Sequence, residues 1–224
     1  MIKENLLKVL EEIKNGNNLA EPITLVGATK MVSVDEINFA ISNGLKVVAE
    51  NRVQEFREKT AFINGASQHF IGHLQTNKVK YLVGKVDLIH SVDSIRLGQE
   101  ISKECLKKEV YQDILVEINI GGELSKSGFS LENAKDGVME LTKLPNIKVV
   151  GLMAMLPKTE DTALLKNLCL QMRELYDKLK SDGLPFTYLS VGMSADYKIA
   201  IENGSNTIRL GTTIFGKRNY EVKN

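Results

Sequence analysis

The sequence has little of what marks secreted, disulfide-bonded or membrane-spanning proteins. Its 224 residues include two cysteines, Cys105 and Cys169, each alone within an amphipathic helical pattern. Isolated cysteines of this kind are typical of free thiols in a reducing compartment. No apolar run approaches the roughly 20 residues that a membrane-spanning helix needs, and the N-terminal segment alternates apolar and charged residues, unlike a secretory signal. We therefore expect a cytoplasmic protein with no membrane partner.

An excess of charge of either sign is also lacking. Lysine and arginine total 29 and aspartate and glutamate total 28, so the formal net charge is +1. This balance gives no electrostatic reason to expect nucleic acid or an anionic membrane as a partner. Any anion that the protein binds must therefore be held by a local site.

Linkers and familiar catalytic motifs are absent too. The four prolines are scattered and no Ser/Gly tract occurs, so we expect one domain over residues 1–224, with an N-terminal helix and linker in 1–22. Neither G-x-G-x-x-G, typical of dinucleotide-binding turns, nor G-x-S-x-G, typical of hydrolases, is present. His69, His73 and His90 have no cysteine or carboxylate nearby to complete a zinc pattern, so no metal site is expected.

What the sequence does contain is a regular alternation of short apolar runs and amphipathic stretches. The apolar runs are typical of parallel strands buried on both faces, and they cover 23–29, 45–50, 68–73, 86–91, 112–119, 147–153, 186–191 and 206–211. The helical stretches between them cover 33–44, 52–63, 76–84, 93–108, 131–144, 161–183 and 194–204. This pattern predicts an α/β fold, most simply a single (β/α)₈ TIM-type barrel, with a doubly wound open sheet as the alternative.

Polar and glycine-rich residues follow the last two expected strands. In "SVGMSAD" we expect Ser194 to cap a helix, and in "RLGTTIFG" Gly211 lets the backbone approach a ligand closely while Thr212 adds a hydroxyl. Helix N-termini favour phosphate, and barrels commonly bind phosphate after strands 7 and 8. The alternative is that these are ordinary caps and turns.

Lys30 ends the first apolar run, "TLVGATK", with no carboxylate beside it. At a barrel mouth, away from bulk water and near a cation such as Arg209, more of this lysine would be the free amine that attacks a carbonyl. A phosphorylated aldehyde, such as pyridoxal 5′-phosphate or the phosphosugar of a Schiff-base aldolase, would suit both the lysine and the phosphate turns. The alternatives are a surface lysine for Lys30 and a buried ion pair for Arg209.

These motifs together resemble a known family, the small pyridoxal-phosphate-binding homeostasis proteins, also called the YggS or proline synthetase co-transcribed family. The matching segments span about residues 23–220 and include "LVGATK", "HFIGHLQTNK", "SKSGF" and "IRLGTTIFGKRNY". The resemblance implies a fold-type III pyridoxal-phosphate barrel, like the N-terminal domain of alanine racemase without its C-terminal β-domain. It also implies site residues: Lys30 forming the internal aldimine, Asn51 near the ring, Met153 lining the pocket, Arg209 facing the pyridine nitrogen, and Ser190, Ser194, Gly211 and Thr212 surrounding the phosphate.

Two departures from the family pattern concern the rim of the expected site. The usual Gly-Glu-Asn-Tyr after the second strand is "AENR" here, with Ala49 and Arg52, and the usual Arg-Asp-Tyr near the end is "RNY" at 218–220. Neither affects Lys30, Arg209 or the phosphate turns.

The resemblance leaves two classes of function open: a non-catalytic carrier of the cofactor in vitamin B6 homeostasis, and an amino-acid racemase or Schiff-base lyase. Racemisation needs a second acid/base opposite the lysine, which in two-domain alanine racemases comes from the C-terminal domain of the partner subunit. Because this chain ends at Asn224, we expect the carrier, with no racemase activity. We further expect a monomer, with apo forms of pyridoxal-phosphate enzymes as possible partners.

Overall fold

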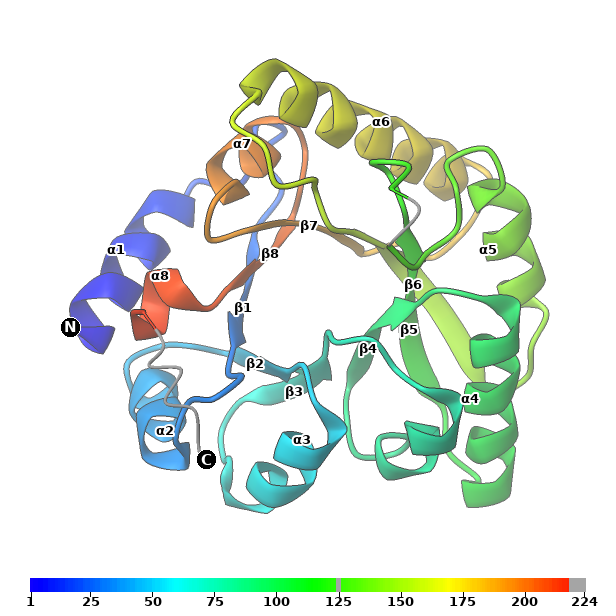
Figure 1. The fold of residues 1–224 in the computed structure, drawn as a ribbon, viewed down its shortest axis with the longest axis horizontal. Coiled ribbons are helices and arrows are strands. Elements are labelled where there is room, and N and C mark those ends of the chain that lie inside the picture. The colour runs from blue at the N-terminus through cyan, green and yellow to red at the C-terminus, as the bar shows by residue number, and fades with distance from the viewer. Residues whose placement is uncertain (124–125, 218–224) are drawn as a thin grey trace.

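The structure is a closed barrel of eight parallel strands, seen in a computed structural model that describes residues 1–123 and 126–217 (Figure 1). The strands are β1 (Thr24–Ala28), β2 (Val47–Glu50), β3 (Ser67–Phe70), β4 (Leu88–Val92), β5 (Gln112–Ile118), β6 (Ile147–Ala154), β7 (Tyr188–Met193) and β8 (Thr207–Leu210). Each strand pairs with the next in the sequence, and β8 pairs with β1 to close the barrel. The barrel prediction is therefore confirmed and the open sheet is excluded. Ser125, the first residue of "SKSGF", and "RNY" at 218–220 lie outside the described residues.

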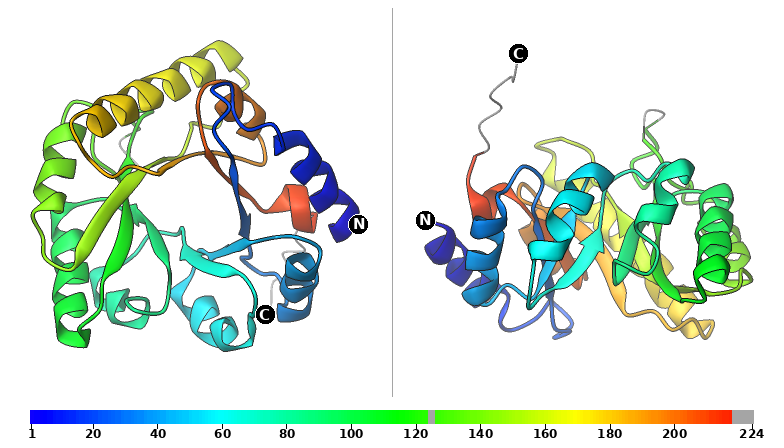
Figure 2. Two further views of the ribbon diagram at one scale, coloured as in Figure 1. Left: turned by 180° about the vertical axis from the view of Figure 1, so that it is seen from behind. Right: turned by 90° about the horizontal axis from the view of Figure 1, so that it is seen from below.

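Helices surround the barrel, as the front view of Figure 1 and the view from behind in Figure 2 show. They are α1 (Ile2–Ile13), α2 (Val34–Ser42), α3 (Val53–Lys59), α4 (Ile95–Lys108), α5 (Ala134–Thr142), α6 (Thr162–Ser181), α7 (Tyr197–Glu202) and α8 (Thr212–Phe215), with 3₁₀ turns η1 (Thr60–Phe62) and η2 (Thr76–Tyr81). The stretch expected to be helical at 76–84 is thus a short 3₁₀ helix. Within the described part of the chain, no helix is long and apolar enough to span a bilayer.

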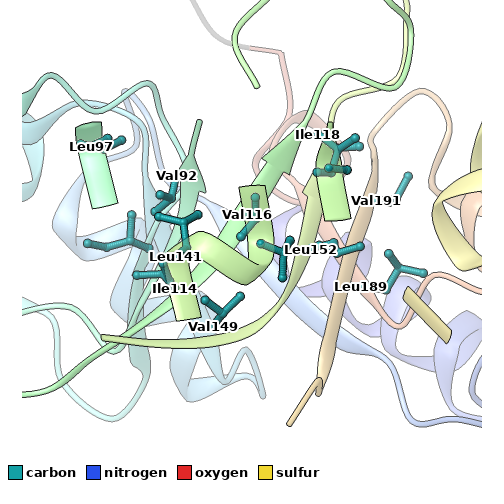
Figure 3. Packing of buried hydrophobic residues seen from close by; sticks show 14 of the residues in the cluster. Val92, Leu97, Ile114, Val116, Ile118, Leu141, Val149, Leu152, Leu189 and Val191 are labelled. Atoms are coloured by element: carbon teal, nitrogen blue, oxygen red, sulfur yellow. The ribbon is translucent and has the colours of Figure 1, made fainter. Parts of the chain in front are cut away.

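The main core lies between the outer face of the strands and the helices. Side chains such as Val116, Leu152 and Leu189 point outward from the sheet and are at most 1% exposed (Figure 3). Leu141 of α5 and Leu97 of α4 belong to the same cluster. Complete burial of one such side chain contributes roughly 1.5–3 kcal/mol, so this layer holds the barrel in shape. The continuous apolar runs in the sequence reflect this burial.

The N-terminal helix α1 covers the seam where β8 meets β1. The helix after β8, α8, is a single turn, and α1 lies against it (Figure 1). Leu6 and Val9 of α1 are buried in one cluster with Ile214 of α8, and Asn5 Nδ2 donates to the Ile214 carbonyl at 3.2 Å. Helix α1 therefore takes the position that a longer eighth helix would otherwise occupy.

Candidate functional site

A cavity of about 360 Å³ opens at the carboxyl ends of the strands. Its walls come from residues at or just beyond the ends of β1, β2, β3, β6, β7 and β8, namely Ala28, Lys30, Asn51, Ile71, Met155, Met193, Ser194, Ala195, Arg209, Gly211 and Thr212. Six of the residues that the sequence singled out, Lys30, Asn51, Ser194, Arg209, Gly211 and Thr212, thus line one cavity. Active sites of such barrels lie on this face.

Lys30 is partly buried, and the residues on either side of it are tethered. Thr29 donates its hydroxyl to Glu50 Oε1 at 2.7 Å, and the Met31 backbone N–H donates to Glu55 Oε2 at 2.7 Å. Met31 has a φ of 59°, a left-handed conformation that is uncommon for a residue with a side chain. Strained backbone of this kind persists where the surroundings enforce it. The backbone around Lys30 is therefore held in one position.

Lys59 of α3 connects the two tethers. Its Nζ lies 2.9 Å from Glu50 Oε1, 2.8 Å from Glu55 Oε2 and 3.0 Å from the Thr29 carbonyl. Burial raises the pKa of Glu50, and the bonds from Lys59 and Thr29 oppose this effect in part. Burial would also raise the pKa of Glu55, but the hydrogen bonds from Lys59 and the Met31 N–H lower it overall. One lysine thus neutralises two carboxylates that position the loop of Lys30.

Arg209 lines the cavity, and its charge is buried. It is 5% exposed, and Nη1 donates to the carbonyl and hydroxyl oxygens of Ser190, while Nη2 donates to the Ala154 carbonyl at 2.9 Å. Burial lowers the pKa of Arg209 to about 10, opposed by the charges of Glu117 and Asp196. The guanidinium therefore remains a cation at neutral pH, fixed by the barrel wall.

Two buried histidines continue this polar chain into the barrel. His90 Nδ1 lies 3.1 Å from Ser190 Oγ, and His90 Nε2 lies 3.0 Å from His69 Nδ1. Since Arg209 can only donate to Ser190, the Ser190 hydroxyl is free to donate to His90, and His90 then donates to His69. Every proton is placed when both rings are neutral and protonated at Nε2. Burial agrees with this: it lowers the pKa of His69 from 6.5 to about 4 and that of His90 well below 6.5.

Ser190 and Met153 do not line the cavity, although the sequence placed them at the site. Ser190 is fully buried beneath it, bonded to Arg209 and His90. Met153 is 1% exposed and packs inside the barrel with Leu115 and Val150, so Met155, two residues later, forms the wall.

The prediction that Ser194 caps a helix is wrong. Helix α7 begins at Tyr197, and Asp196 Oδ1 accepts a hydrogen bond from the Met193 N–H at 2.6 Å, which makes a tight turn before the helix. Ser194 Oγ instead accepts from the Thr213 N–H at 3.3 Å. Its hydroxyl therefore joins the turns after β7 and β8, where we expected a phosphate.

Asn51 is held at the cavity because its backbone packs closely against Gly72. A Cβ added to Gly72 would lie 1.9 Å from the Asn51 carbonyl oxygen, so no larger residue fits there without displacing Asn51. In the "AENR" departure, Ala49 of β2 is buried among Val26 and Ile71, whereas Arg52, just after the strand, is exposed.

Sequence reasoning missed the supporting residues Glu50, Lys59 and Glu117 and gave no role to the His69–His90 pair. The sequence did contain an indication of them: Glu50, His69, His90 and Glu117 lie within buried strands, where polar side chains require hydrogen-bond partners. The partners themselves come from other strands and helices, which spacing does not reveal. No group of three or more potential metal ligands occurs among residues 1–123 and 126–217.

A family model described as "Alanine racemase, N-terminal domain" matches residues 11–219. The chain is 43% identical over 222 residues to the pyridoxal phosphate homeostasis protein of Aquifex aeolicus, covering 98% of this chain and 96% of that protein. It is 31% identical to the protein of the same name from Escherichia coli K12, covering 99% of each. The structure of PipY from Synechococcus elongatus with pyridoxal phosphate bound is similar, with a TM-score of 0.85 and 27% identity over 96% of this chain and 100% of that one.

The closed barrel, the lysine after its first strand and the family match define a barrel of the alanine racemase N-terminal type. Within that class, this chain belongs to the family of pyridoxal phosphate homeostasis proteins. The resemblance seen in the sequence is thereby confirmed.

Proposed function

We propose that this protein binds pyridoxal 5′-phosphate in the Lys30 cavity and serves vitamin B6 homeostasis inside the cell without catalysing a reaction. The observation that carries this proposal is the meeting of Lys30, Arg209 and the turns at Ser194, Gly211 and Thr212 in one cavity. The names of the curated relatives and the pyridoxal phosphate bound in PipY support it. The buried free thiols Cys105 and Cys169 fit a cytoplasmic location.

The residues present fit this cofactor. Lys30 supplies an amine that can bond the aldehyde carbon. Hydroxyls of Ser194 and Thr212, with the backbone at Gly211, supply donors for a phosphate. When bound, the cofactor supplies an electrophilic aldehyde and a ring that accepts electrons. Arg209, placed at the ring nitrogen, would donate to it and keep it unprotonated, which weakens the ring as an electron acceptor.

The lining of the cavity favours a carrier over an enzyme. Among the described residues that form its walls there is no Tyr, His, Cys, Asp or Glu, so Lys30 is the one side chain there suited to accept a proton from carbon. Racemisation needs a second such group on the opposite face. The alternative function, a racemase or a Schiff-base lyase, has the shared barrel in its favour. The alanine racemase of Clostridium difficile is 20% identical, which supports the fold alone.

Absorption spectroscopy tests the cofactor assignment. Addition of pyridoxal phosphate to the purified protein should produce a visible band that borohydride bleaches, and Lys30→Ala should lose it. Lys85→Ala, which changes an exposed lysine, is the matched control and should keep the band. A reducible band of normal intensity in Lys30→Ala would refute the role of Lys30.

Chiral chromatography separates the carrier from the racemase. Alanine and other amino acids incubated with the protein should racemise no faster than with free pyridoxal phosphate at equal concentration. Turnover far above that control, and lost in Lys30→Ala, would show that the protein is an enzyme.

A further inference from the structure

A second cavity, of about 310 Å³, lies beside the first. Asn51 lines both cavities. The other walls come from the segments that follow β2 and β3, including α3 and η2, which neighbour each other around the barrel (Figure 1). Two ligands could therefore bind on either side of Asn51, at the carboxyl ends of adjacent strands.

The charge of this second cavity is uniformly positive or neutral. Arg52, Arg57 and Lys78 line it together with His73, and no aspartate or glutamate is among its lining residues. Within residues 1–123 and 126–217, none of the three permanent cations forms an ion pair with a carboxylate; His73 pairs with Asp93 at 3.3 Å. The whole chain has a net charge of only +1. The concentration of unpaired cations is thus a local property of this cavity.

The side-chain N–H groups of this cavity are also available as hydrogen-bond donors. The Arg57 guanidinium carbon lies 4.5 Å from the centre of the Tyr81 ring, and Lys78 Nζ lies 5.9 Å from it, so the same aromatic ring attracts both cations. In the described structure, the side chains of Arg57, Gln75 and Lys78 donate no hydrogen bond to a protein acceptor. A guanidinium carries its donors at the edge of its plane, where an oxyanion can accept them.

We propose that this cavity binds a small phosphate-bearing molecule next to the cofactor site. Three unpaired cations attract the double charge of a phosphate monoester more strongly than the single charge of a carboxylate. That such a ligand would sit beside bound pyridoxal phosphate rests on the proposed function, whereas phosphate binding itself does not. A phosphorylated form of vitamin B6 and an unrelated phosphate ester share this chemistry.

The imidazole of His73 can report binding in the second cavity by NMR, because His73 lines that cavity. Its side chain is 63% exposed, whereas His69 and His90 are 4% and 0% exposed. The imidazole signals of His73, identified by their loss in His73→Gln, are followed by NMR during titrations at constant pH and ionic strength. The probes are inorganic phosphate, pyridoxamine phosphate, glycerol phosphate and glutamate. Cofactor binding is followed separately by the visible band, so failure of either proposal is seen on its own.

Phosphate should shift the His73 signals saturably, and glutamate should bind at least tenfold more weakly. Pyridoxamine phosphate binding much more tightly than glycerol phosphate would identify the ligand as a vitamin B6 form; equal affinities would identify a general phosphate site. The double variant Arg57→Gln/Lys78→Gln should weaken phosphate binding at least tenfold. Lys80→Gln is the matched control, because Lys80 lies 5.2 Å from the same Tyr81 ring but does not line the cavity, and it should bind within twofold of wild type.

Three results would overturn the proposal. They are the absence of a saturable shift with phosphate, a loss in Lys80→Gln as large as in the double variant, and tighter binding of glutamate than of phosphate. Far-UV circular dichroism of each variant shows whether it is folded.

Discussion

At the scale of single residues, Arg209 shows how the barrel holds a cation with no carboxylate among residues 1–123 and 126–217 in contact with it. Its guanidinium bonds to backbone carbonyls and the Ser190 hydroxyl, and burial lowers its pKa to about 10. The buried ion pair considered from the sequence is therefore not what holds Arg209. Ser190, which the resemblance placed at the phosphate, links Arg209 to His90.

The Ser194 hydroxyl gives a residue-scale prediction about the phosphate. Ser194→Ala should weaken binding of pyridoxal phosphate about tenfold or more, because a hydrogen bond to a charged group is worth roughly 1.5–3 kcal/mol, and 1.4 kcal/mol is one decade. Binding of pyridoxal, which has no phosphate, should change little. Equilibrium titration of both ligands checks this.

Ser181→Ala, at an exposed position at the end of α6, is the control and should bind both ligands as wild type does. If wild type bound pyridoxal and pyridoxal phosphate equally well, the phosphate would not be the main anchor.

At the scale of elements, α3 acts on the site without contributing a side chain to the Lys30 cavity. Lys59 near its end reaches Glu50 at the end of β2 and the Thr29 carbonyl beyond β1. Glu55 of the same helix holds the Met31 N–H. The loop that carries Lys30 is thus shaped by a helix that follows the next strand.

Lys59→Met tests this support. It leaves Glu50, 3% exposed, without its cation, so the free energy of unfolding should fall by roughly 2–3 kcal/mol, somewhat less than for a fully buried pair because Lys59 is 13% exposed. Pyridoxal phosphate should also bind more weakly, since the backbone at Lys30 loses a tether. Urea unfolding and the visible band measure the two effects.

Two further variants show whether the effect of Lys59→Met comes from the buried Lys59 network or from the loss of any ion pair. Lys59→Met/Glu50→Gln removes both charges and should recover part of the stability. Lys135→Met breaks a pair between the exposed side chains of Lys135 and Asp182, and should cost far less stability than Lys59→Met because water screens the pair. A similar loss in Lys135→Met and Lys59→Met would contradict the role of the network.

At the scale of the whole molecule, the barrel buries titratable groups that water would otherwise keep charged. His69 and His90 are buried as neutral rings, and burial raises the pKa of Glu50 and Glu117. Acid changes the contributions of these two sets to stability in opposite directions. Folding disfavours a proton on each histidine, whereas it favours a proton on each glutamate.

The histidines predict a loss of stability on acidification from pH 6.5 towards 4. In this range the unfolded chain binds protons on His69 and His90 that the folded chain excludes, so the free energy of unfolding falls, by up to roughly 1.4 kcal/mol per pH unit for each ring. His69→Gln should reduce this slope. Urea unfolding of wild type and His69→Gln at several pH values measures it; an equal slope in the two proteins would argue against the buried pair as its source.

The sequence by itself determined the alternation of strands and helices, favoured a barrel over an open sheet, and named six of the residues that line its cavity. Strand and helix patterns are local, and parallel strands bring their carboxyl ends to one face whatever their spacing. Lys30, Ser194, Gly211 and Thr212 could therefore be placed together from their positions after strands, and Arg209 from its place within the last strand. Asn51 was named through the family resemblance.

Only the tertiary structure decided which side chains meet. Closure of the barrel brings His90 to Ser190, 100 residues away in the sequence, and leaves Met153 facing an apolar cluster while Met155 reaches the cavity. Helix α7 begins at Tyr197, later than the sequence pattern predicted, so Ser194 does not cap it. The Ser194 hydroxyl instead accepts a hydrogen bond from the Thr213 N–H in the segment after β8. Such contacts depend on the register and twist of several strands at once, and no periodicity within one segment encodes them.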